Sequence, residues 1–236
     1  MKRHIVFTDK EIRLNKYLGL AGICSRREAD ALMEAKKIAV NGRHVSPGIK
    51  VVNGDALTIM EDETLCLYFL YYKPRGEIVG QKIEKNITLD PVGRLDKESE
   101  GLLLYTNDFR VTESLLHPKH SHAKEYTVTV REKPTPRVEK LLLSGIKTQE
   151  AEYAPAKKVS IIPETHRIVI TLTEGKKHEV RRMLNALYLT IDKLVRTKLL
   201  FFTTLNMKEG VMRELTKLEK AKLLQELSLK EQSHIL

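Results

Sequence analysis

The first sixty residues alternate short apolar stripes with turn signals. Apolar side chains recur at helical spacing in residues 11–20, namely Ile12, Leu14, Tyr17 and Leu18. This spacing predicts a short helix that ends at Gly19 or Gly22. Ser25 followed by Glu28 is a capping box and predicts the start of a second helix, whose buried stripe is Ala29, Leu32 and Met33.

Turn residues then divide the chain into short strands. Asn41-Gly42 is typical of a tight hairpin turn, and Asn53-Gly54-Asp55 predicts a turn before a strand in ALTIM, residues 56–60. The polar stretch from Glu61 to Thr64 is the best candidate for a linker.

The remaining residues predict a mixed sheet with covering helices. Residue runs that favour strands are Cys66 to Tyr72, Gly101 to Thr106, Lys124 to Val130, and the pair KKVSII and HRIVITLT around Pro163. Alternating apolar positions in the last of these indicate a sheet with one buried face. Helices are predicted over Arg137 to Leu143, over Lys177 to Leu189, and from Arg213 onward with an apolar stripe of Leu215, Leu218, Leu223 and Leu227 that packs on the sheet.

Basic residues outnumber acidic ones, because the 236-residue chain carries 41 Lys and Arg against 31 Asp and Glu, a net charge of +10. Such an excess favours a polyanionic partner, most commonly nucleic acid. The apolar runs are too short to cross a bilayer, and the N-terminus lacks the apolar stretch of a signal peptide, so we expect no membrane association. The only cysteines, Cys24 and Cys66, have no metal-binding spacing, which fits a reduced, cytoplasmic compartment.

Two segments carry candidate chemistry. The first turn of the capped helix holds Ser25, Arg26 and Arg27, where free backbone N–H groups and the helix dipole favour a phosphate. Lys36, Lys37 and Arg43 extend this basic character, although a solvated helix face explains the charges equally well.

The second segment is GRLDKESEGLLLYTND, residues 93–108, in which Asp96 precedes an apolar strand. Asp96 could be a turn residue bonded to its own backbone. Together with Glu98 and Glu100 it could also be part of a carboxylate pair for glycosidic acid–base chemistry, or of a Mg²⁺ cluster for phosphodiester cleavage. Spacing alone excludes none of these readings.

The N-terminal segment RLNKYLGLAGICSRREADALMEAKKIAVNGR resembles the S4 RNA-binding domain. The resemblance covers about 50 residues and rests on RLNKYL, the ICSRREAD helix start and the VNG turn. It implies that the helix beginning at Ser25 and the following hairpin bind structured RNA through Ser25, Arg26, Arg27, Lys37 and Arg43.

The rest of the chain resembles ribosomal-RNA pseudouridine synthases that carry an N-terminal S4 domain. The similar motifs, in order, are YYKPRGEIV, GRLDKESEGLLLYTND, HPKHSHAKEYTVTV, EGKKHEVRRM, KLVRTKL and MRELT. The resemblance implies isomerisation of uridine to pseudouridine in ribosomal RNA, with a lean towards large-subunit RNA, and a reaction that needs no cofactor and no metal.

Roles for individual residues follow from the same resemblance. Asp96 would be the catalytic nucleophile or base, Arg181 its salt-bridging cation, and Tyr126 the ring that stacks on the flipped uracil. Arg94 would fill the space that the base leaves in the RNA. Lys124, from the same triplet as Tyr126, is a further candidate for substrate binding, and so is Leu194, as an apolar wall of the pocket.

Some features depart from the family or invite other readings. The segment from Gly80 to Val92 is shorter than is common in the family, and Ala186-Leu187-Tyr188 lacks the family's Gly after the VRRM helix. Tyr71-Tyr72 replaces the usual Leu-Asn before Lys73-Pro74, and Arg196 to Leu200 differs from the usual R-x-x-I-G. His117, His120 and His122 have ligand-like spacing but no fourth ligand nearby, which disfavours zinc.

We therefore expect an α+β protein with an S4 module over 11–62 and a catalytic domain with a mixed, largely antiparallel sheet over 66–236. Its partner would be ribosomal RNA, and the protein would be a cytoplasmic monomer. Two alternatives remain: a non-catalytic S4-type ribosome-assembly factor, and a metal-dependent RNA nuclease that uses Asp96, Glu98 and Glu100.

Overall fold

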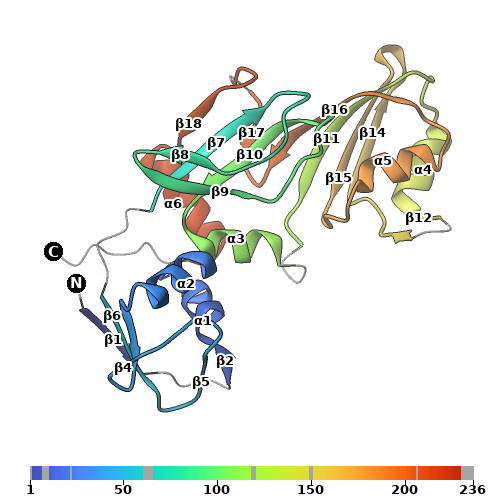
Figure 1. The fold of residues 1–236 in the computed structure, drawn as a ribbon. Coiled ribbons are helices and arrows are strands. Elements are labelled where there is room, and N and C mark those ends of the chain that lie inside the picture. Colours follow the sequence, from blue (N-terminus) through green and yellow to red (C-terminus); the bar gives the residue numbers. More distant parts are fainter. Residues whose placement is uncertain are drawn as a thin grey trace.

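The computed structural model describes residues 2–6, 11–21, 23–60, 66–117, 121–148, 151–205 and 207–229. These residues form two units, each with its own sheet and apolar core (Figure 1). This is the expected α+β architecture. The predicted linker from Glu61 to Thr64 lies outside the described residues, so the boundaries 11–62 and 66–236 stay a prediction.

The N-terminal unit packs two helices, α1 (Leu14–Leu20) and α2 (Arg26–Glu34), against a small sheet. The sheet has the order β1-β6-β3-β4, built from β1 (Lys2–Val6), β3 (Ile38–Val40), β4 (Arg43–His44) and β6 (Ala56–Met60). A separate pair joins β2 (Ile12–Arg13) to β5 (Lys50–Val51). The buried side chains of this unit are Leu14, Leu18, Cys24, Ala29, Met33, Ile38, Val51, Leu57 and Ile59.

Local signals in the sequence account for this unit. Ser25 Oγ accepts a hydrogen bond from the Glu28 backbone N–H, and the Glu28 side chain accepts one from the Ser25 N–H, so the predicted capping box is confirmed. Asn41 and Gly42 both have positive φ, 50° and 76°, as the tight turn between β3 and β4 requires. The predicted end of the first helix is wrong in part, because α1 continues through Gly19.

The larger unit is built on a ten-stranded sheet whose main path runs β14-β15-β11-β16-β10-β7-β18 (Figure 1). Its strands are β7 (Tyr68–Lys73), β8 (Lys82–Glu84), β9 (Ile87–Val92), β10 (Glu100–Thr106), β11 (Lys124–Val130), β14 (Lys158–Ile162), β15 (Arg167–Leu172), β16 (Ile191–Leu199), β17 (Phe202–Thr203) and β18 (Met212–Glu214). Among the described strands of this sheet, only the β10–β16 pair is parallel. The helices of this unit are α3 (Phe109–Leu116), α4 (Pro136–Ser144), α5 (Glu179–Asn185) and α6 (Lys217–Glu226), with a 3-10 turn, η2 (Pro163–Thr165), and a small hairpin of β12 (Ile146–Lys147) and β13 (Glu152–Tyr153).

The β10–β16 pair joins the two halves of the sheet through only two registered positions, Glu100 with Val195 and Gly101 with Arg196. Gly101 has φ +107°, and a Cβ atom there would lie 2.4 Å from the carbonyl oxygen of Arg196. The strands can therefore meet here only because residue 101 has no side chain.

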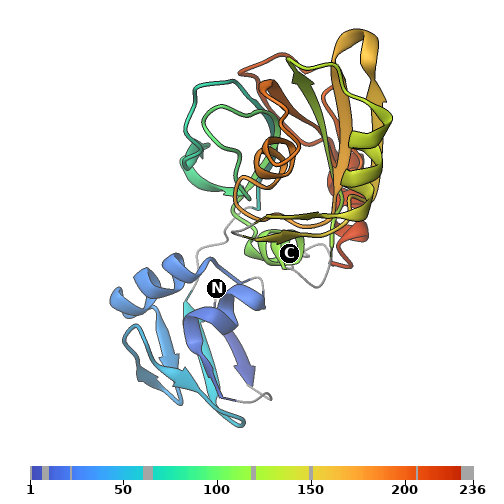
Figure 2. The ribbon, with the colours of Figure 1, turned by 90° about the vertical axis from the view of Figure 1, so that its right-hand side faces the viewer.

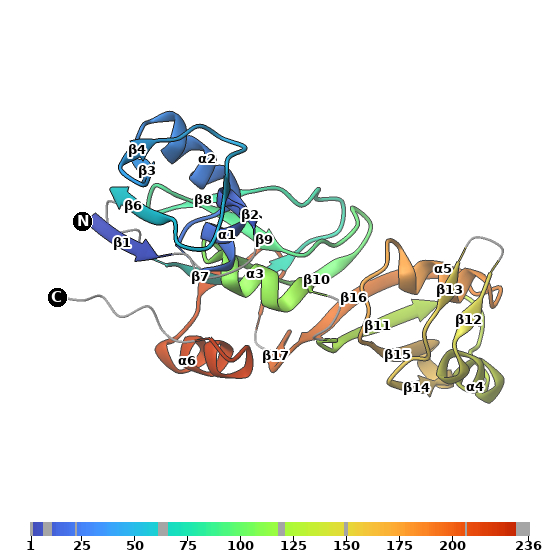
Figure 3. The same cartoon turned by 90° about the horizontal axis from the view of Figure 1, so that it is seen from below.

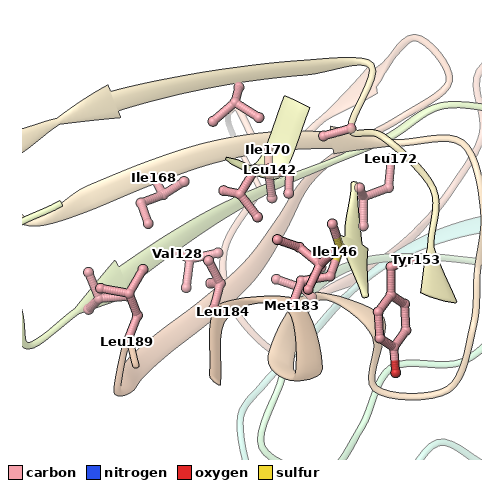
Figure 4. Close-up of a cluster of buried hydrophobic side chains, with 14 of the residues drawn as sticks. Val128, Leu142, Ile146, Tyr153, Ile168, Ile170, Leu172, Met183, Leu184 and Leu189 are labelled. Atoms are coloured by element: carbon pink, nitrogen blue, oxygen red, sulfur yellow. The ribbon is translucent and has the colours of Figure 1, made fainter. Parts of the chain in front are cut away.

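The half of the sheet that contains β7, β9 and β10 is called the first half-sheet, and the half that contains β11, β15 and β16 the second. Side chains along β7 and β10 alternate between the two faces, so the first half-sheet has an apolar cluster on each face. One cluster includes Leu70 and Leu104 and is covered by α3 and α6. The other includes Tyr71 and Leu103. The second half-sheet is covered by α4 and α5, whose cluster is drawn in Figure 4 and includes Val128, Leu142, Ile146, Ile168, Ile170, Met183 and Leu184.

Most predicted strands are confirmed, but two predicted helices are corrected. The helix expected over Lys177 to Leu189 is the shorter α5, Glu179–Asn185. The helix expected from Arg213 is wrong at its start, because Met212–Glu214 pairs with β7 and α6 begins only after the Thr216 capping box. Leu218, expected on the buried stripe, is 84% exposed, since Leu223 and Leu224 form the buried face of α6.

The two units touch where α1 meets α3, as all three ribbon views show (Figures 1, 2 and 3). A Cβ atom at Gly19 would lie 2.9 Å from Cδ1 of the Phe109 ring, so the small residue inside α1 permits this close approach. Among the described residues, no helix is long and apolar enough to cross a membrane.

Candidate active site

Asp96 lies on the loop between β9 and β10, and the buried side chain of Lys73 stabilises this loop. Lys73, the last residue of β7, is fully buried. Its ammonium donates to the carbonyl oxygens of Pro74 at 2.9 Å, Lys97 at 3.1 Å and Ser99 at 2.7 Å. Two of these acceptors, Lys97 and Ser99, follow Asp96 within three positions, so Lys73 stabilises the backbone directly after Asp96.

Further contacts complete the loop. The Ser99 N–H donates to the Asp96 carbonyl oxygen at 3.0 Å, and the Gly76 N–H donates to the Lys97 carbonyl oxygen at 2.8 Å. Leu95 is buried in the same cluster as Tyr71 and Leu103, which anchors the residue next to Asp96. Burial lowers the pKa of Lys73, and nearby carboxylates oppose that shift.

The Asp96 carboxylate meets two nitrogen donors from the start of α5. Arg181 Nε lies 3.5 Å from Oδ2, and His178 Nε2 lies 3.2 Å from Oδ1. The Asp96 side chain is 34% exposed, against 42% for His178 and 24% for Arg181. Arg181 also donates from Nη2 to Ser99 Oγ at 2.9 Å, so it contacts both Asp96 and the last residue of the loop. The structure thus brings Arg181 to Asp96 as the sequence predicts.

Glu179 stabilises the turn that leads into α5. Glu179 is buried, and its side chain accepts a hydrogen bond from the Lys176 backbone N–H at 3.1 Å. Burial raises the pKa of Glu179, and that hydrogen bond opposes the shift. This arrangement fixes the turn that presents His178 and Arg181.

Tyr126 lies half-buried on β11, which pairs with β16 in the sheet. It packs against the cluster that contains Leu95 and against the cluster under α5. Its backbone pairs with Ile170 on β15 and with Arg196 on β16. Tyr126 and the Asp96 loop therefore share one apolar cluster on the same face of the sheet.

Lys124, at the start of β11, has a supporting position. Its ammonium lies 3.2 Å from the carbonyl oxygen of His122 and 3.5 Å from that of Glu174, both as acceptors. Burial, followed by the positive charge of Arg196, lowers the pKa of Lys124. These contacts tie β11 to the segment that leads into α5.

The remaining predicted site residues of the larger unit are Arg94 and Leu194. Arg94 is exposed on the same loop as Asp96. Leu194 is 4% exposed and packs in the core under α5, opposite Val128. Leu194 thus serves the core, and its role as a pocket wall stays a prediction.

The two acidic residues after Asp96 are paired with other cations. Glu98 accepts from Arg75 Nε at 2.9 Å, and this contact lowers the pKa of Glu98. The buried Glu100 pairs with Lys193 Nζ at 2.9 Å. Within the described ranges, no three His, Cys, Asp or Glu side chains gather in a way that could hold a metal ion. His120, part of the disfavoured histidine motif, lies outside those ranges.

On the N-terminal unit, Arg26 and Arg27 are exposed in the first turn of α2, and Arg43 is exposed on β4. Lys37 is half-buried just before β3. Ser25 acts as the helix cap, so its side chain holds the start of the helix that displays the two arginines.

Two residues of the site, Lys73 and His178, are not predicted by the sequence. Both lie inside the motifs KPRG and EGKKHEVRRM. Nothing local in the sequence shows that Lys73 reaches carbonyl groups 24 and 26 positions away. The contact of His178 with Asp96 depends on how the start of α5 packs against the Asp96 loop.

Comparison with known proteins identifies the family of the chain. A family model of the S4 domain matches residues 12–57, and one described as RNA pseudouridylate synthase matches residues 47–186. The chain is 36% identical over 226 residues to ribosomal large subunit pseudouridine synthase B of Bacillus subtilis (strain 168), covering 86% of this chain and 92% of that protein.

One further relative and one solved structure indicate the same family. Dual-specificity RNA pseudouridine synthase RluF of Escherichia coli (strain K12) is 32% identical over 225 residues, covering 88% of this chain and 77% of the relative. A crystal structure of a pseudouridylate synthase matches with a TM-score of 0.64 at 25% identity, covering 90% of this chain and 99% of the other. With an S4 domain ahead of the matched catalytic region and Asp96 held beside Arg181, the chain belongs to the RNA pseudouridylate synthase family.

Proposed function

We propose that this protein converts uridine to pseudouridine in ribosomal RNA, with large-subunit RNA as the substrate. The observation that carries the proposal is the Asp96 carboxylate, open to solvent on a braced loop and flanked by Arg181 and His178. The name of the Bacillus subtilis relative, a ribosomal large subunit pseudouridine synthase, supports the choice of RNA. We further propose that the protein acts as a monomer in the cytoplasm, where ribosomal RNA is available.

The reaction breaks the N1–C1′ bond of uridine and forms a C5–C1′ bond, while C5 loses a proton and N1 gains one. The atoms of the nucleotide are conserved, so the chain needs only groups that bind, orient and transfer a proton. Asp96 acts as nucleophile or base, and the Arg181 guanidinium lies beside its carboxylate as a partner of opposite charge.

The target base has to leave the RNA helix to reach Asp96. We propose that Tyr126 stacks on the flipped uracil, since its ring lies half-buried beside the cluster that anchors Leu95. Arg94 is exposed two residues before Asp96, in a position to fill the gap that the base leaves. Lys124 acts in this scheme by bracing β11 against the segment before α5.

In this proposal the N-terminal unit binds the RNA. Arg26 and Arg27 project from the first turn of α2, where free backbone N–H groups also favour phosphate. Lys37 and Arg43 lie on the following segment of the same unit, and the net charge of +10 supports attraction to RNA as a whole.

The test is to map pseudouridines in ribosomal RNA from cells with and without the gene, by carbodiimide treatment and primer extension. We expect one stop in large-subunit RNA to disappear with the gene and to return with the wild-type copy. An Asp96→Asn copy should bind RNA but not restore the stop. If no stop is lost from either ribosomal RNA, the assignment of this substrate is refuted and a non-catalytic assembly role becomes the better explanation.

A further inference from the structure

His178 lies at the start of α5 and contacts Asp96. It is the N-cap residue of α5, yet its side chain makes no capping hydrogen bond. Glu179, one position later, accepts the hydrogen bond from the backbone at this turn instead. The imidazole is turned towards Asp96 and remains 42% exposed.

The backbone at His178 is also strained. Its φ of 57° and ψ of 26° lie in the left-handed region, which glycine adopts more readily than a residue with a side chain. The position nevertheless holds a histidine, and its ring faces Asp96. A strained residue beside a reactive group points to a role in function.

The contact geometry supplies that role. Arg181 and His178 approach different oxygens of Asp96, Nε on Oδ2 at 3.5 Å and Nε2 on Oδ1 at 3.2 Å. One contact alone would leave the carboxylate free to rotate about its own axis. Two nitrogen atoms, one facing each oxygen, restrict that rotation relative to the loop.

We infer that His178 is a positioning residue for the reaction: its Nε2–H donates to Asp96 Oδ1 and holds the carboxylate in the orientation that meets the flipped uridine. This inference rests on the proposed function. His178 touches Asp96 rather than the substrate, so its effect falls on turnover and leaves the RNA grip of the N-terminal unit unchanged.

The test uses the full-length chain and a transcript of large-subunit ribosomal RNA labelled with [5-³H]uridine, from which isomerisation releases tritium. His178→Gly removes the imidazole and relaxes the backbone strain. We expect kcat to fall roughly 10- to 100-fold, the effect of losing one hydrogen bond to a charged group, with KM unchanged. His178→Gln retains a side-chain N–H donor and should recover part of the lost kcat.

A matched control is His166, which follows η2. It also has a left-handed backbone, with φ 53°, and its Nδ1 lies 2.8 Å from the Arg131 carbonyl oxygen. His166→Gly should leave kcat unchanged. A His178→Gly enzyme with wild-type kcat, or a His178→Gln enzyme no faster than the glycine variant, would overturn the inference.

A second measurement does not depend on turnover. Long-range ¹H–¹⁵N spectra of the imidazole, assigned with the His178→Gly variant, should show a different Nε2 chemical shift in the wild type and in Asp96→Ala. An Nε2 chemical shift that is the same in the two proteins would overturn the contact itself. Failure of the wild type to release tritium refutes the proposed substrate, and the spectra still decide whether His178 is paired with Asp96.

Discussion

Replacing Lys73 by methionine tests whether one buried ammonium holds the catalytic loop. Methionine retains an unbranched apolar stem and removes the charge and its donors. The change deletes the hydrogen bonds to the carbonyl oxygens of Pro74, Lys97 and Ser99. Of these three acceptors, that of Lys97 also accepts from the Gly76 N–H, so the Asp96 loop loses support chiefly at Ser99.

The magnitude follows from two opposing terms. Three hydrogen bonds from a charged donor stabilise the fold by about 1.5–3 kcal/mol each, or about 5–9 kcal/mol together. Keeping the ammonium out of water costs several kcal/mol, which the variant no longer bears. We therefore expect Lys73→Met to lower the free energy of unfolding by about 2–4 kcal/mol, and Tm by about 5–12 °C for a chain of this size.

The assay is urea unfolding together with tritium release from labelled ribosomal RNA. Both stability and kcat should fall, because the loop that carries Asp96 loses its brace. The control is Lys85→Met, which removes the exposed ion pair with Glu214 and should cost at most about 1 kcal/mol. A Lys73→Met protein as stable and as active as the Lys85→Met control would show that Lys73 does not hold the loop.

Three further changes test other parts of the structure. Arg26→Ala with Arg27→Ala should weaken RNA binding and lower the salt slope by about one phosphate contact for each residue, measured by filter binding between two salt concentrations. An unchanged slope would show that α2 does not face RNA. Gly101→Ala should destabilise the chain by at least about 3 kcal/mol, because its Cβ would meet the Arg196 carbonyl oxygen; unfolding in urea at the wild-type midpoint would contradict this contact. Glu219→Gln should be less stable than the wild type near neutral pH. Its ion pair lowers the carboxylate pKa to about 2, so this difference should shrink as pH falls from about 5 towards 2, and a difference that stays constant would refute it.

Local signals in the sequence were enough to predict much of the secondary structure. The capping box at Ser25 and the left-handed pair Asn41-Gly42 act within a few residues, so their geometry follows from the residues themselves. The strand over Lys124 to Val130 was predicted with its bounds, because its alternation reflects one buried face. The segment from Arg213 was misread because Met212–Glu214 takes its conformation from pairing with β7, a partner about 140 positions earlier in the chain.

The order of motifs determined the family, and with it the expectation that Asp96, Tyr126 and Arg181 form the site. Sequence could not determine how these residues are supported. The brace from Lys73, the second donor from His178 and the close approach at Gly101 all join segments that are distant in the chain. Such contacts depend on how the strands and α5 pack in three dimensions, so only the tertiary structure decides them.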